Sequence, residues 1–395
     1  MKKSLIALAV IAASGTAMAQ STVTLYGLID ANVGAYKTNV VSGTAIQSMS
    51  QTKLESGGLN GSRWGMKGSE DLGGGLAAIF QLESGFAVDT GASAQGGLLF
   101  GRRANVGLAG GFGKLEIGRN SSSYDDVSAD HAMMAQYLFD PSNTNNGNSA
   151  STAAGMTPAT PTATLTAAQA QTAALANQQK FLNRTFSWIG YNTRFDNSFK
   201  YTSPNLAGFT ASAMYALGED KTSALSASKS FSANVKYANG PLLVSAGYQS
   251  EAVASSVTAT RSPALENALV SAAYDFGVAK LGLGFNRAKY KDVTAPAILG
   301  GGAFAAQDEY NVSVAVPIGA ATISAGYAQS KGDTLGKSSG FGVQALYALS
   351  KRTTLYGGGV NTKAYDKLAD AVRLASPTSS IAKNTTYAVG VRHTF

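Results

Sequence analysis

The chain ends with residues 384–395, NTTYAVGVRHTF, and its side chains alternate in character up to the last one. One parity holds Tyr387, Val389, Val391, His393 and Phe395, and the other holds Thr386, Ala388, Gly390, Arg392 and Thr394. A period of two is the signature of a β-strand. A terminus that frays in water has no reason to carry this pattern. We therefore expect the last strand to be paired along its length.

The same alternation recurs throughout the chain. In the opening segment Val23, Leu25 and Ile29 share one face, whereas the opposite face is mostly polar. Turn signals rich in Gly, Pro, Asn and Asp separate the segments. We count about sixteen strands on these signals, near 21–37, 60–70, 74–87, 97–110, 112–120, 194–203, 207–217, 229–238, 241–250, 266–276, 279–289, 308–316, 319–330, 338–349, 352–363 and 382–395.

The connections alternate between short turns and long polar stretches. The long ones lie near 38–59, 88–96, 120–193, 218–228, 251–265, 290–307, 331–337 and 364–381. Short turns on one rim and long loops on the other are typical of an up-and-down barrel in an outer membrane. A soluble sandwich or lectin-like domain has the same alternation. The even strand number and a lumen too wide for side chains to fill favour the all-β, 16-stranded antiparallel transmembrane barrel.

A barrel explains why the chain stops inside a strand. In hydrocarbon, each unpaired amide at a strand edge costs several kcal/mol, so the last strand must pair with the first. The chain can then end at that seam. We expect Tyr387 to Phe395 to face lipid, with Phe395 in the aromatic girdle at the periplasmic rim.

The N-terminus has the features of a secretory signal. Lys2 and Lys3 precede the apolar run 5–13, and Ala17-Met18-Ala19 fits a cleavage site. The run is too short for an anchoring helix, which needs about 20 residues. We expect residues 1–19 to be a cleaved signal peptide and residues 20–395 to form a single barrel domain.

Composition excludes several classes of protein. The chain has no cysteine, which rules out disulfides and thiolate metal sites. Its formal net charge of +8, or +6 without Lys2 and Lys3, is too small for a nucleic-acid binder of this length. The two histidines, His131 and His393, sit in no catalytic motif, and no phosphate loop occurs. We expect no enzyme activity, no cofactor and no metal.

Several stretches resemble the general, non-specific porins of Gram-negative outer membranes, of the beta-proteobacterial and neisserial type. They are VTLYGLIDANVGAY (23–36), GSRWGMKGSEDLGGGLAAIFQLESGF (61–86), FGRRANVGL (100–108), GKLEIGRN (113–120), DNSFKYTSPNLAGF (196–209) and VGVRHTF (389–395). The resemblance implies a water-filled channel, usually a homotrimer, through which small hydrophilic solutes and inorganic ions diffuse. It also implies that the third extracellular loop folds into the lumen and that the barrel-assembly machinery reads the terminal Phe395.

Parity and the resemblance together nominate basic residues for the pore wall. Arg63 and Lys67 alternate with Trp64 and Met66, and Arg194 and Lys200 alternate with apolar residues in the same way. Arg102 and Arg103 form an adjacent pair, the RR pair, and the two arguments differ on which of them faces the lumen. Alternation favours Arg103, whereas the resemblance favours Arg102. Arg119 shares the parity of Leu115 and Ile117 and is expected outside the channel.

Acidic residues are expected opposite this basic wall. Asp125, Asp126 and Asp130 lie on the loop, and Glu83 and Asp30 face the lumen from strands. Three basic wall positions against two or three loop aspartates predict a slight preference for anions. A solute-selective channel and an adhesin-like barrel with binding loops remain as alternatives.

Only residues 141–185 lack a counterpart in the resemblance. This part of loop 120–193 begins with Asn, Ser, Thr and Pro and continues as an Ala- and Gln-rich stretch that favours a short helix. We expect the insertion to cap or partly plug the channel mouth.

Overall fold

The computed structural model describes residues 22–42, 45–142, 187–219, 227, 229–252, 264–292, 295, 299–375 and 380–395. The expected signal peptide and the helix expected within the insertion lie outside these residues. The strands are β1 (Thr22–Ser42), β2 (Ala45–Ser56), β3 (Arg63–Gly73), β4 (Leu76–Gly85), β5 (Arg103–Gly110), β6 (Gly113–Ser121), β7 (Arg194–Thr202), β8 (Phe209–Ala216), β9 (Ser230–Asn239), β10 (Leu242–Ala252), β11 (Ala264–Asp275), β12 (Lys280–Lys291), β13 (Gln307–Ile318), β14 (Ala321–Gly332), β15 (Gly336–Ala348), β16 (Thr353–Lys363) and β17 (Ser380–Thr394).

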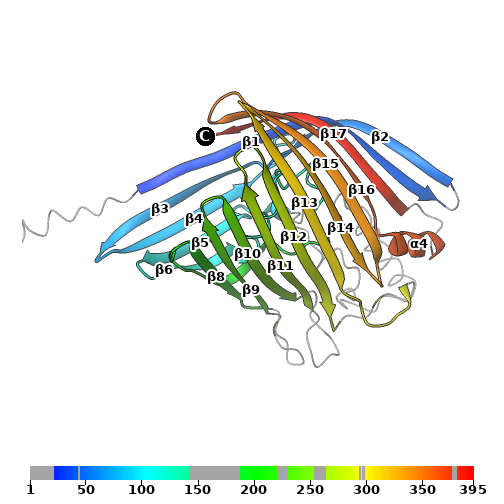
Figure 1. Ribbon diagram of the computed structural model, residues 1–395. Helices are drawn as coiled ribbons and strands as arrows, with labels where there is room; N and C mark the ends of the chain where they lie inside the picture. The colour runs from blue at the N-terminus through cyan, green and yellow to red at the C-terminus, as the bar shows by residue number, and fades with distance from the viewer. Residues whose placement is uncertain are drawn as a thin grey trace, which may run out of the picture.

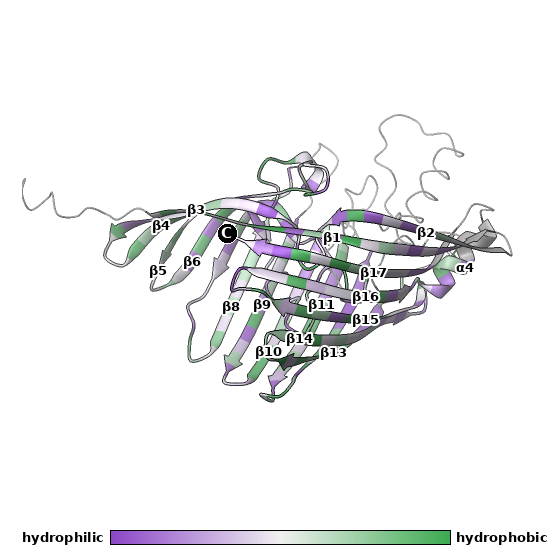
Figure 2. Cartoon of the chain, turned by 90° about the horizontal axis from the view of Figure 1, so that it is seen from above, coloured by the Kyte–Doolittle hydropathy of each residue, from purple (hydrophilic) through white to green (hydrophobic). Residues whose placement is uncertain are grey.

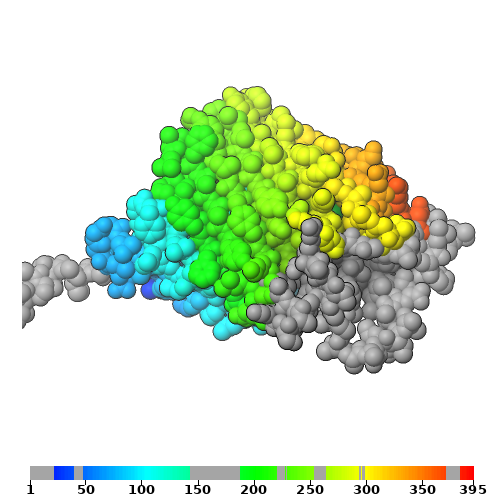
Figure 3. Space-filling view, turned by 90° about the horizontal axis from the view of Figure 1, so that it is seen from below, coloured from blue at the N-terminus to red at the C-terminus, as the bar shows by residue number. Residues whose placement is uncertain are grey.

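The strands form one closed antiparallel barrel (Figure 1). β1 pairs with β2, consecutive strands from β3 onward pair with each other, and β17 returns to pair with β1 from Leu28 opposite Thr394 to Val41 opposite Ser380. Gly27 and Phe395 exchange two backbone hydrogen bonds of 3.1 and 3.0 Å at the end of this seam. The expected pairing of the last strand with the first is therefore confirmed. In the space-filling view of Figure 3 the colour runs from blue through green and yellow to orange across one face, as expected of a chain that follows the wall in order.

The wall of the barrel has sixteen strand positions although the chain has seventeen strand segments. The reason is that β2 and β3 together occupy one position beside β1. β3 pairs with Thr22 to Leu28 and β2 pairs with Ala31 to Ser42. Residues 57–62 interrupt the strand between them. The prediction of a polar loop at 38–59 was wrong, since the first hairpin extends through that stretch to a turn near 43–44.

The two faces of the wall differ in polarity, as the alternating colours of Figure 2 show. On β13, Gln307, Glu309 and Asn311 are buried, whereas the intervening Tyr310 and Val312 are exposed. On β17, Tyr387, Val389 and Val391 are likewise exposed on the outer face, and so is Phe395, which follows the strand. Apolar side chains outside and polar ones inside are the arrangement of a membrane barrel.

Parts of the connection between β6 and β7 pack against the polar face of the wall. Ser123 N donates to Ser232 Oγ on β9 at 2.8 Å, and Met133 N donates to Ser313 Oγ on β13 at 2.9 Å. On the return, Ile189 N donates to Glu309 Oε1 at 2.6 Å. We refer to residues 122–142 as the 122–142 segment.

A buried apolar cluster lies beside the returning chain. It brings together residues of β11, β12 and several connections, namely Ile189, Leu265, Ala288, Tyr290, Ala295, Phe304, Leu335, Tyr365 and Leu368. Leu368 belongs to helix α4 (Asp366–Ala375), and a short 3-10 helix, η1 (Gln95–Gly97), lies between β4 and β5. Among the described helices, none has the length and apolar character needed to cross a membrane.

Candidate functional site

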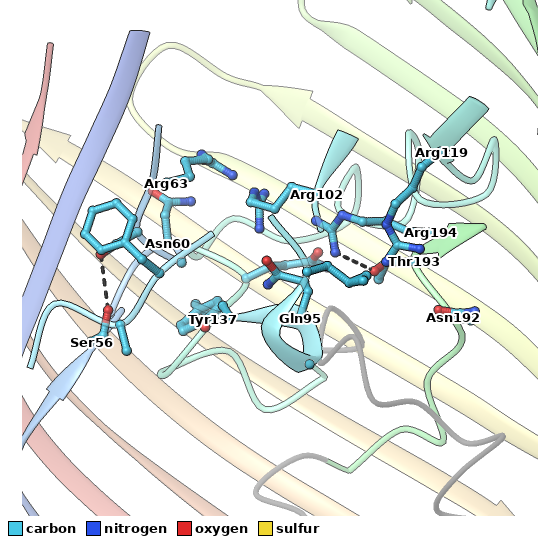
Figure 4. Close-up of a pocket in the computed structure, with 18 of the residues that line it drawn as sticks. Ser56, Asn60, Arg63, Gln95, Arg102, Arg119, Tyr137, Asn192, Thr193 and Arg194 are labelled. Carbon is cyan, nitrogen blue, oxygen red and sulfur yellow. Dashed lines mark hydrogen bonds between the residues drawn. The ribbon is translucent and has the colours of Figure 1, made fainter. Parts of the chain in front are cut away.

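A cavity of about 590 Å³ lies between the 122–142 segment and the wall formed by β3 to β7. Four arginines lie in a row along it (Figure 4): Arg63, Arg102, Arg119 and Arg194. Gln136 and Tyr137 line it from the 122–142 segment, and Gln95 lines it from η1. A second cavity of about 280 Å³ shares Arg119, Asn192, Arg194 and Asp196 with the first. The shared residues make the two cavities neighbours along one path.

Two of the four arginines are paired with carboxylates. Arg102 Nε lies 2.6 Å from Glu83 Oε1, and Arg119 Nη1 lies 2.6 Å from Asp196 Oδ1. Arg63 and Arg194 have no carboxylate oxygen within 4.0 Å among the described residues. Arg194 Nη1 donates instead to Thr193 Oγ1 at 2.8 Å. The cavity therefore carries an excess of positive charge.

The structure resolves the ambiguity at the RR pair by placing both side chains on the inner side. Arg103 is the first residue of β5 and its Nη2 donates to Ser121 Oγ at 2.9 Å. Arg102 precedes the strand, so alternation does not fix its direction, and it lines the cavity.

Arg119 lines the cavity, so the prediction that it lies outside the channel was wrong. The register of β6 against β7 shifts between Gly118 and Asn120, and Gly118 has φ of +124°. Such a bulge breaks the period of two and redirects the side chain that follows. Arg119 Nε then donates to Gly101 O at 2.8 Å. The glycine before the arginine was the available sequence signal.

The three loop aspartates do not line the arginine cavity. Asp126 pairs with Lys200 at 2.6 Å, and Asp130 pairs with Lys236 at 2.8 Å. The Asp125 carboxylate accepts a hydrogen bond of 2.7 Å from Tyr191 Oη. Burial raises the pKa of Asp125 above its ordinary value. Asp126 therefore faces a predicted base, Lys200, but Asp126 and Asp130 hold the 122–142 segment to the wall.

Of the two acidic wall residues, neither lines the cavity. Glu83 is buried, and it accepts hydrogen bonds from Arg102 Nε at 2.6 Å and Tyr26 Oη at 2.9 Å. Asp30 is 0% exposed, so its expected place on the constriction needs correction. Its carboxylate accepts the N–H groups of Gly58, Leu59 and Asn60 at 2.8–2.9 Å and the Tyr356 hydroxyl at 2.5 Å. Asp30 thus fixes the interruption between β2 and β3.

Lys67 lies on β3 four residues beyond Arg63, nearer the short turn after Gly73. It is exposed, and its Nζ lies 5.5 Å from the ring centroid of Tyr26. Lys67 is absent from the cavity lining. Sequence reasoning missed Gln136 and Tyr137, because neutral residues of a loop give no charge or parity signal. It also did not single out Asp196 as a site residue, although Asp196 is charged and shares the parity of Arg194. No group of three or more His, Cys, Asp or Glu residues in the described chain could hold a metal ion.

Known proteins resemble the chain along its length. Outer membrane porin protein 32 of Delftia acidovorans is 32% identical over 408 residues, which covers 100% of both chains. The major outer membrane protein P.IB of Neisseria meningitidis serogroup B is 41% identical over 136 residues, or 32% of this chain and 36% of that protein. The solved structure of an anion-selective porin from Comamonas acidovorans matches with a TM-score of 0.70 and 25% identity, covering 95% of this chain and 100% of the other.

The resemblance noted in the sequence is confirmed by a family model as well. The model described as Gram-negative porin matches residues 5–367. A match of this extent agrees with the closed barrel and with the polarity of its two faces. The chain belongs to the Gram-negative porin family.

Proposed function

We propose that this outer-membrane porin is a passive, non-enzymatic channel for small hydrophilic solutes and inorganic ions, with a preference for anions. The observation that carries the proposal is the pair Arg63 and Arg194, which line the cavity without a carboxylate partner in the described chain. Charges in water are screened beyond about 8 Å at physiological salt. In a narrow passage every permeating ion comes within that distance, so the local excess of positive charge selects its sign.

The 122–142 segment is the constriction in this proposal. It supplies the neutral residues Gln136 and Tyr137 to the cavity, while the wall supplies all four arginines. Two of its acids, Asp126 and Asp130, pair with Lys200 and Lys236, and none of these four residues lines the cavity. The field in the passage is therefore set by the arginines, which strengthens the expected anion preference.

Reversal potentials in a KCl gradient test this assignment. We expect the wild-type protein in planar bilayers to favour chloride and the Arg63→Gln/Arg194→Gln protein to shift clearly toward potassium. Arg287→Gln is a matched control, because Arg287 is exposed and pairs with Asp308 outside the cavity lining. An unchanged reversal potential in the double variant would refute the assignment.

Solute range is a separate question. We propose general diffusion, for which liposome-swelling rates should fall smoothly with solute size. Saturation by one solute would instead support a solute-selective channel. A homotrimer, recognition of Phe395 by the assembly machinery and contact of the outer face with lipid remain proposals that the family resemblance supports, and cross-linking in native membranes tests the trimer.

A further inference from the structure

Glycines occupy the inner wall where the 122–142 segment runs across it. The relevant residues are Gly247 on β10, Gly282 and Gly284 on β12, and Gly340 and Gly342 on β15, all buried. A Cβ at Gly247 would lie 2.8 Å from Val127 Cγ2, and one at Gly284 would lie 2.6 Å from His131 Cγ. A Cβ at Gly340 would lie 2.7 Å from Pro141 Cβ.

Two of these positions meet the backbone of the segment and not a side chain. A Cβ at Gly282 would collide with the carbonyl oxygen of His131, and one at Gly342 with the carbonyl oxygen of Phe139. A flexible side chain can rotate away from an added methyl group, but a backbone carbonyl can retreat only if the segment moves. These glycines therefore allow the backbone to lie directly on the wall.

Hydrogen bonds hold the segment in register on this wall. Ser313 Oγ donates to His131 O at 2.9 Å and accepts from Met133 N at 2.9 Å. Asn311 Nδ2 donates to Ser142 Oγ at 3.0 Å. Partners along the segment follow the order of the strands, from Val127 at β10 to His131 at β12 and Phe139 at β15. The polar side chains thus fix the position along the wall, whereas the glycines fix the distance from it.

We propose that Gly282, Gly284 and Gly342 are positioning residues that set the width of the passage. The inference rests on the proposed function, because it takes the arginine cavity as the conducting path. The segment presents Gln136 and Tyr137 to this cavity, opposite Arg102 and Arg194. Carbon atoms rest about 3.5–4.0 Å apart. The His131 ring that faces Gly284 is 0% exposed and stacks on Trp188, which leaves it little room to rotate, so a methyl group at Gly284 would push His131 and the segment off the wall by about 1 Å. The displaced segment narrows the passage.

Single-channel conductance of Gly282→Ala and Gly342→Ala tests the proposal. We expect each folded variant to lose roughly a third or more of the wild-type conductance, because conduction through a narrow pore depends steeply on its radius. Gly326→Ala is the matched control, since a methyl group there would meet first the flexible Met134 Sδ, at 3.0 Å. It should conduct like the wild type. Heat-modifiable mobility on gels identifies folded protein, and unchanged conductance in folded Gly282→Ala and Gly342→Ala would overturn the proposal.

A second experiment covers the case in which those variants fail to fold. At Gly284 the clashing atoms belong to the His131 side chain. We expect Gly284→Ala to lower conductance and His131→Ala to restore it in the double variant, with His131→Ala alone as reference. Additive effects without restoration would contradict the proposal. The glycine proposal alone fails if the wild type conducts and its reversal potential responds to the Arg63/Arg194 change, but no glycine variant alters conductance. The proposed function fails if the wild type does not conduct.

Discussion

The contacts of the buried Asp30 carboxylate explain why the strand beside β1 is interrupted between β2 and β3. Three backbone N–H groups of residues 58–60 and the Tyr356 hydroxyl converge on it. Hydrogen bonds to a charged group contribute about 1.5–3 kcal/mol each and their buried donors are costly to orphan. We expect Asp30→Ala to lower the free energy of unfolding by about 3–5 kcal/mol. Urea unfolding in lipid vesicles measures it.

Asp71→Ala is the reference for this change, because the Asp71 carboxylate accepts one exposed hydrogen bond from Gly73 N. Its effect should stay below about 1 kcal/mol. Equal losses in the two variants would show that Asp30 does not hold the interruption in place.

A change at Glu83 tests the charge at the cavity in the opposite direction, because it removes a negative charge where the arginine variant removes positive charges. Its carboxylate neutralises Arg102 across 2.6 Å. Glu83→Gln leaves three of the four cavity arginines without an acidic partner among the described residues, so the reversal potential should move further toward chloride. Glu70→Gln, an exposed change on β3, should leave it unaltered. A shift toward potassium in Glu83→Gln would contradict the assigned field.

Alternation within a strand indicated the direction of side chains where the strand pairing is regular. Parity placed Arg63 of β3 on the inner side, and Arg63 lines the cavity. Arg194 lines it too, although the register of β6 against β7 shifts beside it. Parity failed at Arg119, next to the bulge at Gly118. A bulge is a property of two paired strands, so alternation within one strand does not reveal it.

At the scale of elements, the seam between β17 and β1 closes the barrel. Phe395 exchanges two backbone hydrogen bonds with Gly27, and its ring lies close to Gly27. We expect deletion of Phe395 to reduce the folded fraction more than Phe395→Ala, because only the deletion removes those backbone bonds. Heat-modifiable gel mobility after refolding into vesicles measures both. Equal folded fractions would indicate that the ring, and not the seam, matters for assembly.

The strands that carry apolar residues on alternate positions were recognised from sequence, and β2 was not. Its sequence, AIQSMSQTKLES, is polar on both faces over most of its length. Apolar and polar residues alternate only in a strand that has one apolar face. A strand that is polar on both faces therefore cannot be recognised from this pattern. The pairing of β2 with β1 is instead fixed by the hairpin and by the Asp30 contacts.

Across the whole molecule, the arginine cavity and the apolar cluster around Ile189 and Tyr290 are built from different strands. The cluster draws on β11, β12 and connections as far as the one between β16 and β17, whereas the arginines come from β3, β6, β7 and the β4–β5 connection. The sequence predicted a wet lumen from the strand number alone. The family resemblance implied that the third extracellular loop enters the lumen, but the sequence did not predict which residues the loop contacts there, because those contacts join residues more than a hundred positions apart, such as Ile189 and Glu309.

The insertion leaves and rejoins the barrel at nearly one point, and this permits a clean deletion. Ser187 N and Oγ donate to Pro141 O at 2.8 and 2.9 Å, so these hydrogen bonds join Pro141 and Ser187 directly. Deleting 145–178 should therefore preserve the cavity and, if the insertion obstructs the mouth, raise single-channel conductance. Replacing 145–178 by a Gly–Ser linker of equal length distinguishes an effect of the insertion's volume from an effect of its particular residues. The linker should lower the conductance again only if volume causes the obstruction. A deletion protein with wild-type conductance and selectivity would place the insertion outside the path of ions, as expected of an external binding surface.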